Sequence, residues 1–125
     1  MGTLQLAHAS YSNISISDPT TMVDTTGHAL SSFTVGQEIG VQSVLTNHGT
    51  TNQNYAYMVQ VMDGSGGTDY FQAQSASLEG NQSFTVVQTW IPTSPGTYTV
   101  QVFVWDGLAS AIPLTNVVEK QVTVN

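Results

Sequence analysis

Residues 83–106 hold two runs in which apolar and polar side chains alternate, with a turn between them. The side chains predicted to face inward in these runs are Phe84, Val86, Trp90, Tyr98, Val100, Val102 and Val104. A period of two is typical of half-buried β-strands. Pro92 and the Pro95-Gly96 pair interrupt the pattern, because proline lacks the N–H that a ladder needs. Two such strands cannot bury their apolar face alone, so the chain is predicted to form an antiparallel β-sandwich.

Similar alternation recurs along the rest of the chain. Further strands are predicted at residues 4–17, 38–46, 55–62, 68–78 and 117–124, whereas residues 20–33 are expected to be irregular. No segment has the apolar spacing of an amphipathic helix. The prediction is therefore an all-β, immunoglobulin-like antiparallel β-sandwich of about seven strands, with residues 1–125 as a single domain. Its core is expected to contain Trp90, Tyr98, Val100, Val102, Val41 and Val59, with Tyr98 at the position of a tyrosine corner.

Few side chains carry a charge, which limits the partners of this chain. Charged residues make up 7% of the sequence, lysine and arginine together number 1, and the formal net charge is −7. Lysine and arginine supply affinity for nucleic acids and anionic membranes, so neither partner is expected. The absence of cysteine excludes disulfides and cysteine-ligated zinc. No apolar run reaches the roughly 18 residues of a membrane span, so membrane insertion is not expected either.

Other features favour a location outside the cell. Asn13 and Asn81 begin N-glycosylation sequons, and Lys120 is the one site for trypsin-like proteases. Residues 1–3 do not begin a signal peptide, so the chain is expected to be a module of a longer secreted protein.

Several short motifs, taken in order, resemble one family. They are Val35-Gly36, Leu45-Thr46-Asn47-His48-Gly49-Thr50, Leu78-Glu79-Gly80, Trp90-Ile91-Pro92 and Pro95-Gly96-Thr97-Tyr98. With the proline loop after Trp105 and the Val-Thr-Val ending, they resemble the CARDB type of immunoglobulin-like domain. The resemblance implies a module of archaeal or bacterial secreted and cell-surface proteins, often repeated in tandem, that serves adhesion or envelope structure. It supplies no catalytic residues.

The residue types that bind metals or perform catalysis are scattered. His8, His28 and His48 lack the short spacings that preform a metal site. Asp63 and Asp69 flank a glycine-rich tip, but the closing glutamate of a calcium loop is missing, which favours an ordinary hairpin tip over a weak cation site. No Gly-x-Ser-x-Gly motif is present. The sequence therefore predicts no enzyme, no catalytic residue, no metal site and no cofactor.

Three aromatic residues are candidate ligand contacts. Phe103 and Trp105 occupy the face of their strand opposite to its inward valines, and Tyr70 lies in the more exposed strand 68–78. Exposed aromatic side chains stack on sugars or form protein contacts. A flat exposed row would indicate a carbohydrate-binding module, whereas cover by the loop at residues 107–116 would remove that basis.

The two terminal segments are predicted to carry the binding activity. Residues 4–17 have no charge, and residues 117–124 have only Glu119 and Lys120. Such strands lack the lysines and prolines that usually guard an edge, so they are suited to β-augmentation by another chain. The alternative is that both pair within their own sheets. The expected function is a structural or adhesion module whose partners are other protein modules or copies of itself, with glycans as the alternative.

Overall fold

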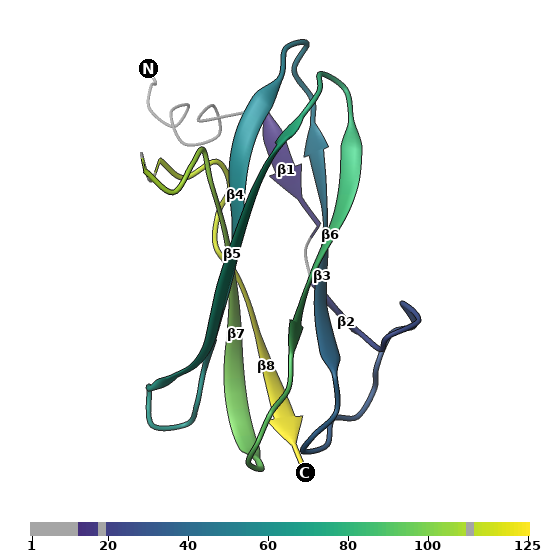
Figure 1. The fold of residues 1–125 in the computed structure, drawn as a ribbon, viewed down its shortest axis with the longest axis vertical. Helices are drawn as coiled ribbons and strands as arrows, with labels where there is room; N and C mark the ends of the chain where they lie inside the picture. The colour runs from purple at the N-terminus through teal and green to yellow at the C-terminus, as the bar shows by residue number, and fades with distance from the viewer. Residues whose placement is uncertain (1–12, 18–19, 110–111) are drawn as a thin grey trace, which may run out of the picture.

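The computed structural model describes residues 13–17, 20–109 and 112–125, and all of their regular structure is β (Figure 1). The eight strands are β1 (Ile14–Ile16), β2 (Thr21–Val23), β3 (Ile39–Asn47), β4 (Gln53–Met62), β5 (Thr68–Leu78), β6 (Ser83–Trp90), β7 (Gly96–Trp105) and β8 (Val118–Val124). No helix long and apolar enough to cross a membrane occurs in these ranges.

The strands form two sheets that pack face to face (Figure 1). In the first, sheet A, β6 pairs with β3 along almost its whole length, while β1 and β2 pair with the two ends of β3. Because a strand has only two edges, β1 and β2 share the edge of β3 that β6 leaves open. The second, sheet B, has the order β5-β4-β7-β8. All these ladders are antiparallel, so the predicted immunoglobulin-like sandwich is confirmed.

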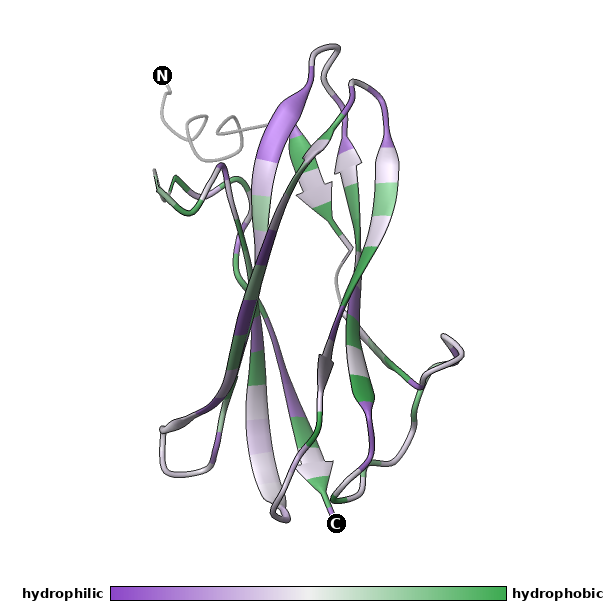
Figure 2. Cartoon of the chain, viewed as in Figure 1, coloured by the Kyte–Doolittle hydropathy of each residue, from purple (hydrophilic) through white to green (hydrophobic). Residues whose placement is uncertain are grey.

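The predicted core is confirmed as well. Its expected members are all buried, with relative exposures between 0% and 4%: Trp90, Tyr98, Val100, Val102, Val41 and Val59. Figure 2 shows the underlying pattern, with apolar and polar bands alternating along the strands. The rings of Trp90 and Tyr98 meet edge to face, with centroids 5.0 Å apart. The Tyr98 hydroxyl donates to the Ser94 carbonyl at 2.6 Å, which is the predicted tyrosine corner.

Three expectations need correction. Residues 20–33 are not wholly irregular, because β2 adds a strand that is too short to show a period in sequence. Phe84 is 49% exposed although it pairs with the buried Leu45, because it lies near the start of an edge strand. Within the predicted strand at residues 4–17, the structure confirms β1 only, and residues 4–12 lie outside the described ranges.

The motifs at one end of the sandwich have a structural explanation. The buried Asn47 side chain donates to the carbonyls of Thr51 and Leu78, at 2.8 and 3.2 Å, and accepts the Gly49 N–H at 2.9 Å. A Cβ on Gly80 would lie 2.5 Å from the carbonyl carbon of Thr50. Asparagine and glycine are therefore required here, because they fasten the β3–β4 turn onto the β5–β6 turn.

Candidate functional site

One lateral side of the sandwich, formed by β5 and β6, is held together by side chains. β5 is one of the two edge strands of sheet B and β6 forms one edge of sheet A, and Figure 1 draws β5 in front of β4 and β7. The Trp90 indole N–H donates to the Asp69 carboxylate at 3.0 Å, and the Tyr70 hydroxyl donates to Gln88 at 3.4 Å. We call this the open side, because these side-chain contacts cross between the sheets while the outer backbone edges of β5 and β6 have no partner strand among the described residues.

A β-bulge places Asp69 for this contact. Val61 pairs with Tyr70 and Met62 with Thr68, so Asp69 is an extra residue in β5. Such an extra residue bends the strand and re-aims its side chain. Here the side chain reaches Trp90 on the opposite sheet.

Asp63 has a different role from Asp69. One of its carboxylate oxygens accepts the Ser65 hydroxyl at 2.7 Å and the backbone N–H groups of Ser65 and Gly67 at 3.0 and 2.9 Å. These hydrogen bonds, with that of the Ser65 side chain the largest cause, lower the pKa of Asp63. The two carboxylates that flank the tip are thus each engaged by protein groups, one capping the hairpin and one bonding to Trp90.

The opposite lateral side, between β8 and the β1/β2 edge, has backbone contacts as well. The segment before β3 runs parallel to the end of β8, with a bridge between Phe33 and Val124. The Asn125 N–H donates to the Phe33 carbonyl at 2.9 Å, and the Val35 N–H donates to the Asn125 carbonyl at 3.1 Å. We call this the closed side. It covers the end of β8, for which the sequence left open pairing with another chain or within its own sheet.

A buried chain of hydroxyls also crosses the interior. Thr20, next to β2, contacts Ser43 at 3.1 Å, and Ser43 contacts the Tyr57 hydroxyl at 2.9 Å. Burial is the main cause that raises the pKa of Tyr57 to about 12. Ser43, the polar position in the inward face of β3, is therefore the middle member of this chain and joins sheet A to Tyr57 of sheet B.

The three candidate aromatic residues do not form one row. Phe103 and Trp105 pair with Met58 and Ala56 on the outer face of sheet B. Tyr70 lies on the inner face and packs against the core. None of the three is fully exposed, and residues 112–114 continue the β8 side of β7 through a bridge between Pro113 and Trp105. The expected flat strip thus reduces to two half-buried rings, and Tyr70 is removed from it.

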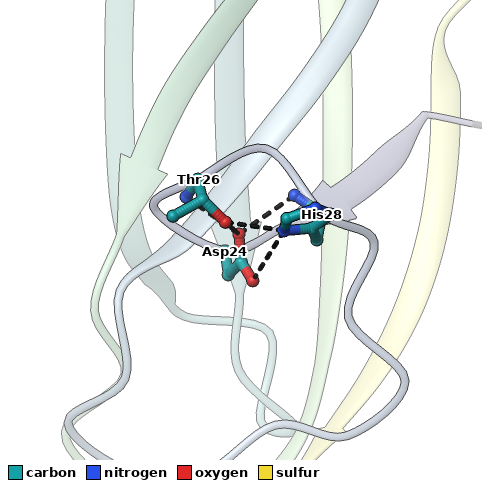
Figure 3. Close-up of polar contacts among 3 residues, drawn as sticks. All are labelled: Asp24, Thr26 and His28. Carbon is teal, nitrogen blue, oxygen red and sulfur yellow. Dashed lines mark hydrogen bonds and ion pairs between the residues drawn. The ribbon is translucent and has the colours of Figure 1, made fainter.

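A small hairpin follows β2 and overhangs the outer face of sheet A. Asp24 accepts the Thr26 hydroxyl at 2.7 Å and the backbone N–H of His28 at 3.0 Å (Figure 3). These bonds lower the pKa of Asp24, with that of the Thr26 side chain the largest cause. The Thr26 hydroxyl proton points to Asp24, so His28, 2.7 Å away, does not act on it as a base. The trio stabilises a turn and is not a catalytic arrangement.

A shallow pocket of about 270 Å³ lies between this hairpin and the outer face of sheet A, next to Glu38, Gly40 and Thr89. Gly40 is needed there, because a Cβ would lie 2.9 Å from the side chain of Val23. No group of three or more potential metal ligands gathers here or elsewhere in the described part of the chain.

The two histidines and the two sequon asparagines of the described residues lie in turns or at strand ends. His28 is in the hairpin, His48 contacts the Ser15 hydroxyl at 2.9 Å, and His8 lies outside the described residues. Asn13 and Asn81 are both exposed and flank the β3–β4 turn, through the bonds His48 N–H to Asn13 O and Asn81 N–H to Gly49 O. Glycosylation of these two asparagines remains a prediction.

A model of the S-layer A-like family matches residues 10–125. The chain belongs to the S-layer A-like family. No curated protein matches this S-layer A-like domain.

Solved structures share its fold. The C-terminal domain of wzt has a TM-score of 0.73 at 12% identity, over 91% of this chain and 74% of that one. The CARDB domain of a Pyrococcus furiosus protein, in complex with di-metal ions, has a TM-score of 0.64 at 18% identity, over 93% and 90%. A β-glucosidase from Listeria innocua has a TM-score of 0.64 at 13% identity, over 92% of this chain but 16% of that one. The chain likewise spans 10% of a β-glucuronidase that it matches.

These likenesses confirm the CARDB-type immunoglobulin-like fold that the motifs indicated. The S-layer A-like and CARDB domain types are small and typically non-catalytic, and the glycosidases match through a small part of their length. The family assignment indicates a surface structural module and a cell-surface location.

Proposed function

We propose that this S-layer A-like domain is a non-enzymatic module of an extracellular protein layer, which acts as a spacer and binds other protein modules or copies of itself. The observation that carries the proposal is the family match over residues 10–125. Two properties of the molecule support the contact role. Its surface is almost without positive charge, and one lateral side ends in two strands whose outer backbone edges have no partner strand among the described residues.

An antibody against the folded domain tests this proposal on the cells that produce it. The antibody should label intact cells to the same extent as permeabilised ones, and cross-linking on intact cells should join the antigen to neighbouring surface protein. Labelling that requires permeabilisation would overturn the proposal.

Carbohydrate binding is the second candidate. It is supported by Phe103 and Trp105, which lie two residues apart on the outer face of sheet B and keep part of their rings exposed. Aromatic faces of this kind stack on sugar rings. A glycan array tests it, and binding that survives both Phe103→Ala and Trp105→Ala would show that this face is not the sugar site.

A further inference from the structure

The outer edge of β5 is the longest unpaired strand edge on the open side. β5 has 11 residues against 8 in β6, and among the described residues it pairs with β4 alone. In an antiparallel ladder, alternate residues direct their N–H and C=O groups away from the partner. The outer edge of β5 is therefore a row of free donors and acceptors that fits a second extended strand.

The space beside β5 is open on both faces of the strand. Leu78 is its one buried residue, and even the side chains on the inner face, such as Gln72 and Gln74, are exposed. By contrast, β6 buries Val86, Gln88 and Trp90 on its inner face. A strand added to β5 would thus meet less of the opposite sheet than one added to β6.

β5 has almost none of the features that block edge-to-edge pairing. Natural edges are blunted by lysine, proline, bulges or inward charge. β5 has neither lysine nor proline, and its one charge and its one bulge coincide at Asp69, near one end. Residues 70–76 are consequently a regular, uncharged edge.

We propose that β5 pairs antiparallel with β5 of a second copy of this chain, around a two-fold axis at Ala73. A second copy supplies an edge of the same length, and one that is free of charge over residues 70–76, so these residues of the two edges carry no charges that repel each other. Joining two copies this way continues sheet B of one molecule into sheet B of the other. The proposal rests on the proposed function, since it names the contact that a layer module would make.

Strand length and charge together favour one register. With the axis at Ala73, Asp69 lies opposite Ser77 of the other copy, and Phe71 lies opposite Ser75. Moving the axis by one residue to Gln74 would place Asp69 opposite Glu79, and like charges directly opposite destabilise a strand pair. The Ala73 register pairs residues 70–76 with themselves and avoids that repulsion.

Complementary charges at the axis give the experiment. Ala73 is partly exposed on the outer face, so a charged side chain fits there. In the homodimer, Ala73→Lys sets two ammonium groups opposite each other, and Ala73→Glu sets two carboxylates. Sedimentation equilibrium of the whole chain should show reversible dimers for the unaltered protein, and dimerisation weakened about tenfold or more for either variant alone. An equimolar mixture of the two variants should restore association.

Thr85→Lys and Thr85→Glu are the matched control pair, since Thr85 is exposed on β6, the other strand of the open side. They should leave dimerisation unchanged within about threefold, because the β5 edge is intact in both. An unaltered chain that stays monomeric at millimolar concentration would overturn the β5 contact. So would dimers that ignore the Ala73 variants or respond to the Thr85 pair instead. None of these results would affect the surface labelling that tests the proposed function.

Discussion

The two lateral sides of this sandwich are built in different ways. On the closed side, residues 33–35 bond to the end of β8 through backbone groups. On the open side, the contacts between sheets come from side chains, chiefly Trp90 with Asp69 and Tyr70 with Gln88. Backbone bonds depend little on which side chains are present, whereas the open side depends on a few particular residues. The backbone edges of the open side are thereby left available for pairing, while the contact between the sheets there depends on side chains that a single substitution can remove.

The largest effect is expected at Trp90. Trp90→Ala removes a side chain that is 1% exposed, together with its ring contact to Tyr98 and its hydrogen bond to Asp69. We expect the free energy of unfolding to fall by about 3–5 kcal/mol. On the closed side, Phe33→Ala should cost about 1 kcal/mol, because the ring is only partly buried and the backbone bonds remain. Urea unfolding measures both, and equal losses would break the comparison.

The next effect concerns Tyr57, whose hydroxyl is linked through Ser43 to Thr20 beside the β1/β2 edge. Its pKa is about 12 in the folded chain and about 10 when unfolded. The contribution of this raised pKa to the free energy of unfolding is complete below pH 10. It is lost as the pH rises towards 12, because the tyrosine of the unfolded chain ionises first. The loss should be about 2–3 kcal/mol. Unfolding measured from pH 9 to 12 should show a smaller decline for Tyr57→Phe, and identical declines would contradict the buried network.

A smaller effect is expected at Asp69. Asp69→Ala leaves the Trp90 N–H without its partner and should cost about 1 kcal/mol. Asp69→Asn keeps an acceptor oxygen and serves as the control. In a Trp105→Phe background, in which Trp90 is the one tryptophan left, the emission should shift to longer wavelength for Asp69→Ala. A change of equal size in both variants would show that charge, not the hydrogen bond, links the sheets.

The smallest effect is local to the hairpin tip that adjoins the open side. Hydrogen bonds lower the pKa of Asp63 below its ordinary value of 3.8, so they are complete above that pH and are lost as the pH falls through the lower folded value. Amide exchange at Ser65 and Gly67 should then quicken in acid relative to the core. Asp63→Asn should abolish that pH dependence, and protection that persists unchanged in strong acid would refute it.

The fold could be predicted from the sequence because apolar and polar residues alternate along a strand according to which face of it is buried. Tyr98, Val100 and Val102 point inward in the structure as their period requires. The family resemblance also followed from residues with local structural reasons, such as Asn47 and Gly80. A strand as short as β2 contains less than two periods of this alternation, so the pattern could not be recognised there.

The candidate sites were harder to predict, because they depend on pairing between distant strands. The bulge opposite Val61 and Met62 decides where Asp69 and Tyr70 point, and neither residue's neighbours in sequence reveal it. The terminal segments were expected to form sheet edges, and β1 and β8 do lie at edges of their sheets. Which other strands end a sheet is set by topology, and topology also placed β5 and β6 at edges, which the sequence did not indicate.

The two ends of the described chain lie at opposite poles of the sandwich, and β1 and β8 both point toward the pole at which the C-terminus lies (Figure 1). A pull applied at these two ends would draw β1 lengthwise along β3, and β8 lengthwise along β7. The hydrogen bonds of each ladder would then be loaded together in shear, and would not break one after another as they do when a strand is peeled off. The bonds of residues 33–35 to Asn125 lie at the loaded pole, so they act as a mechanical clamp there.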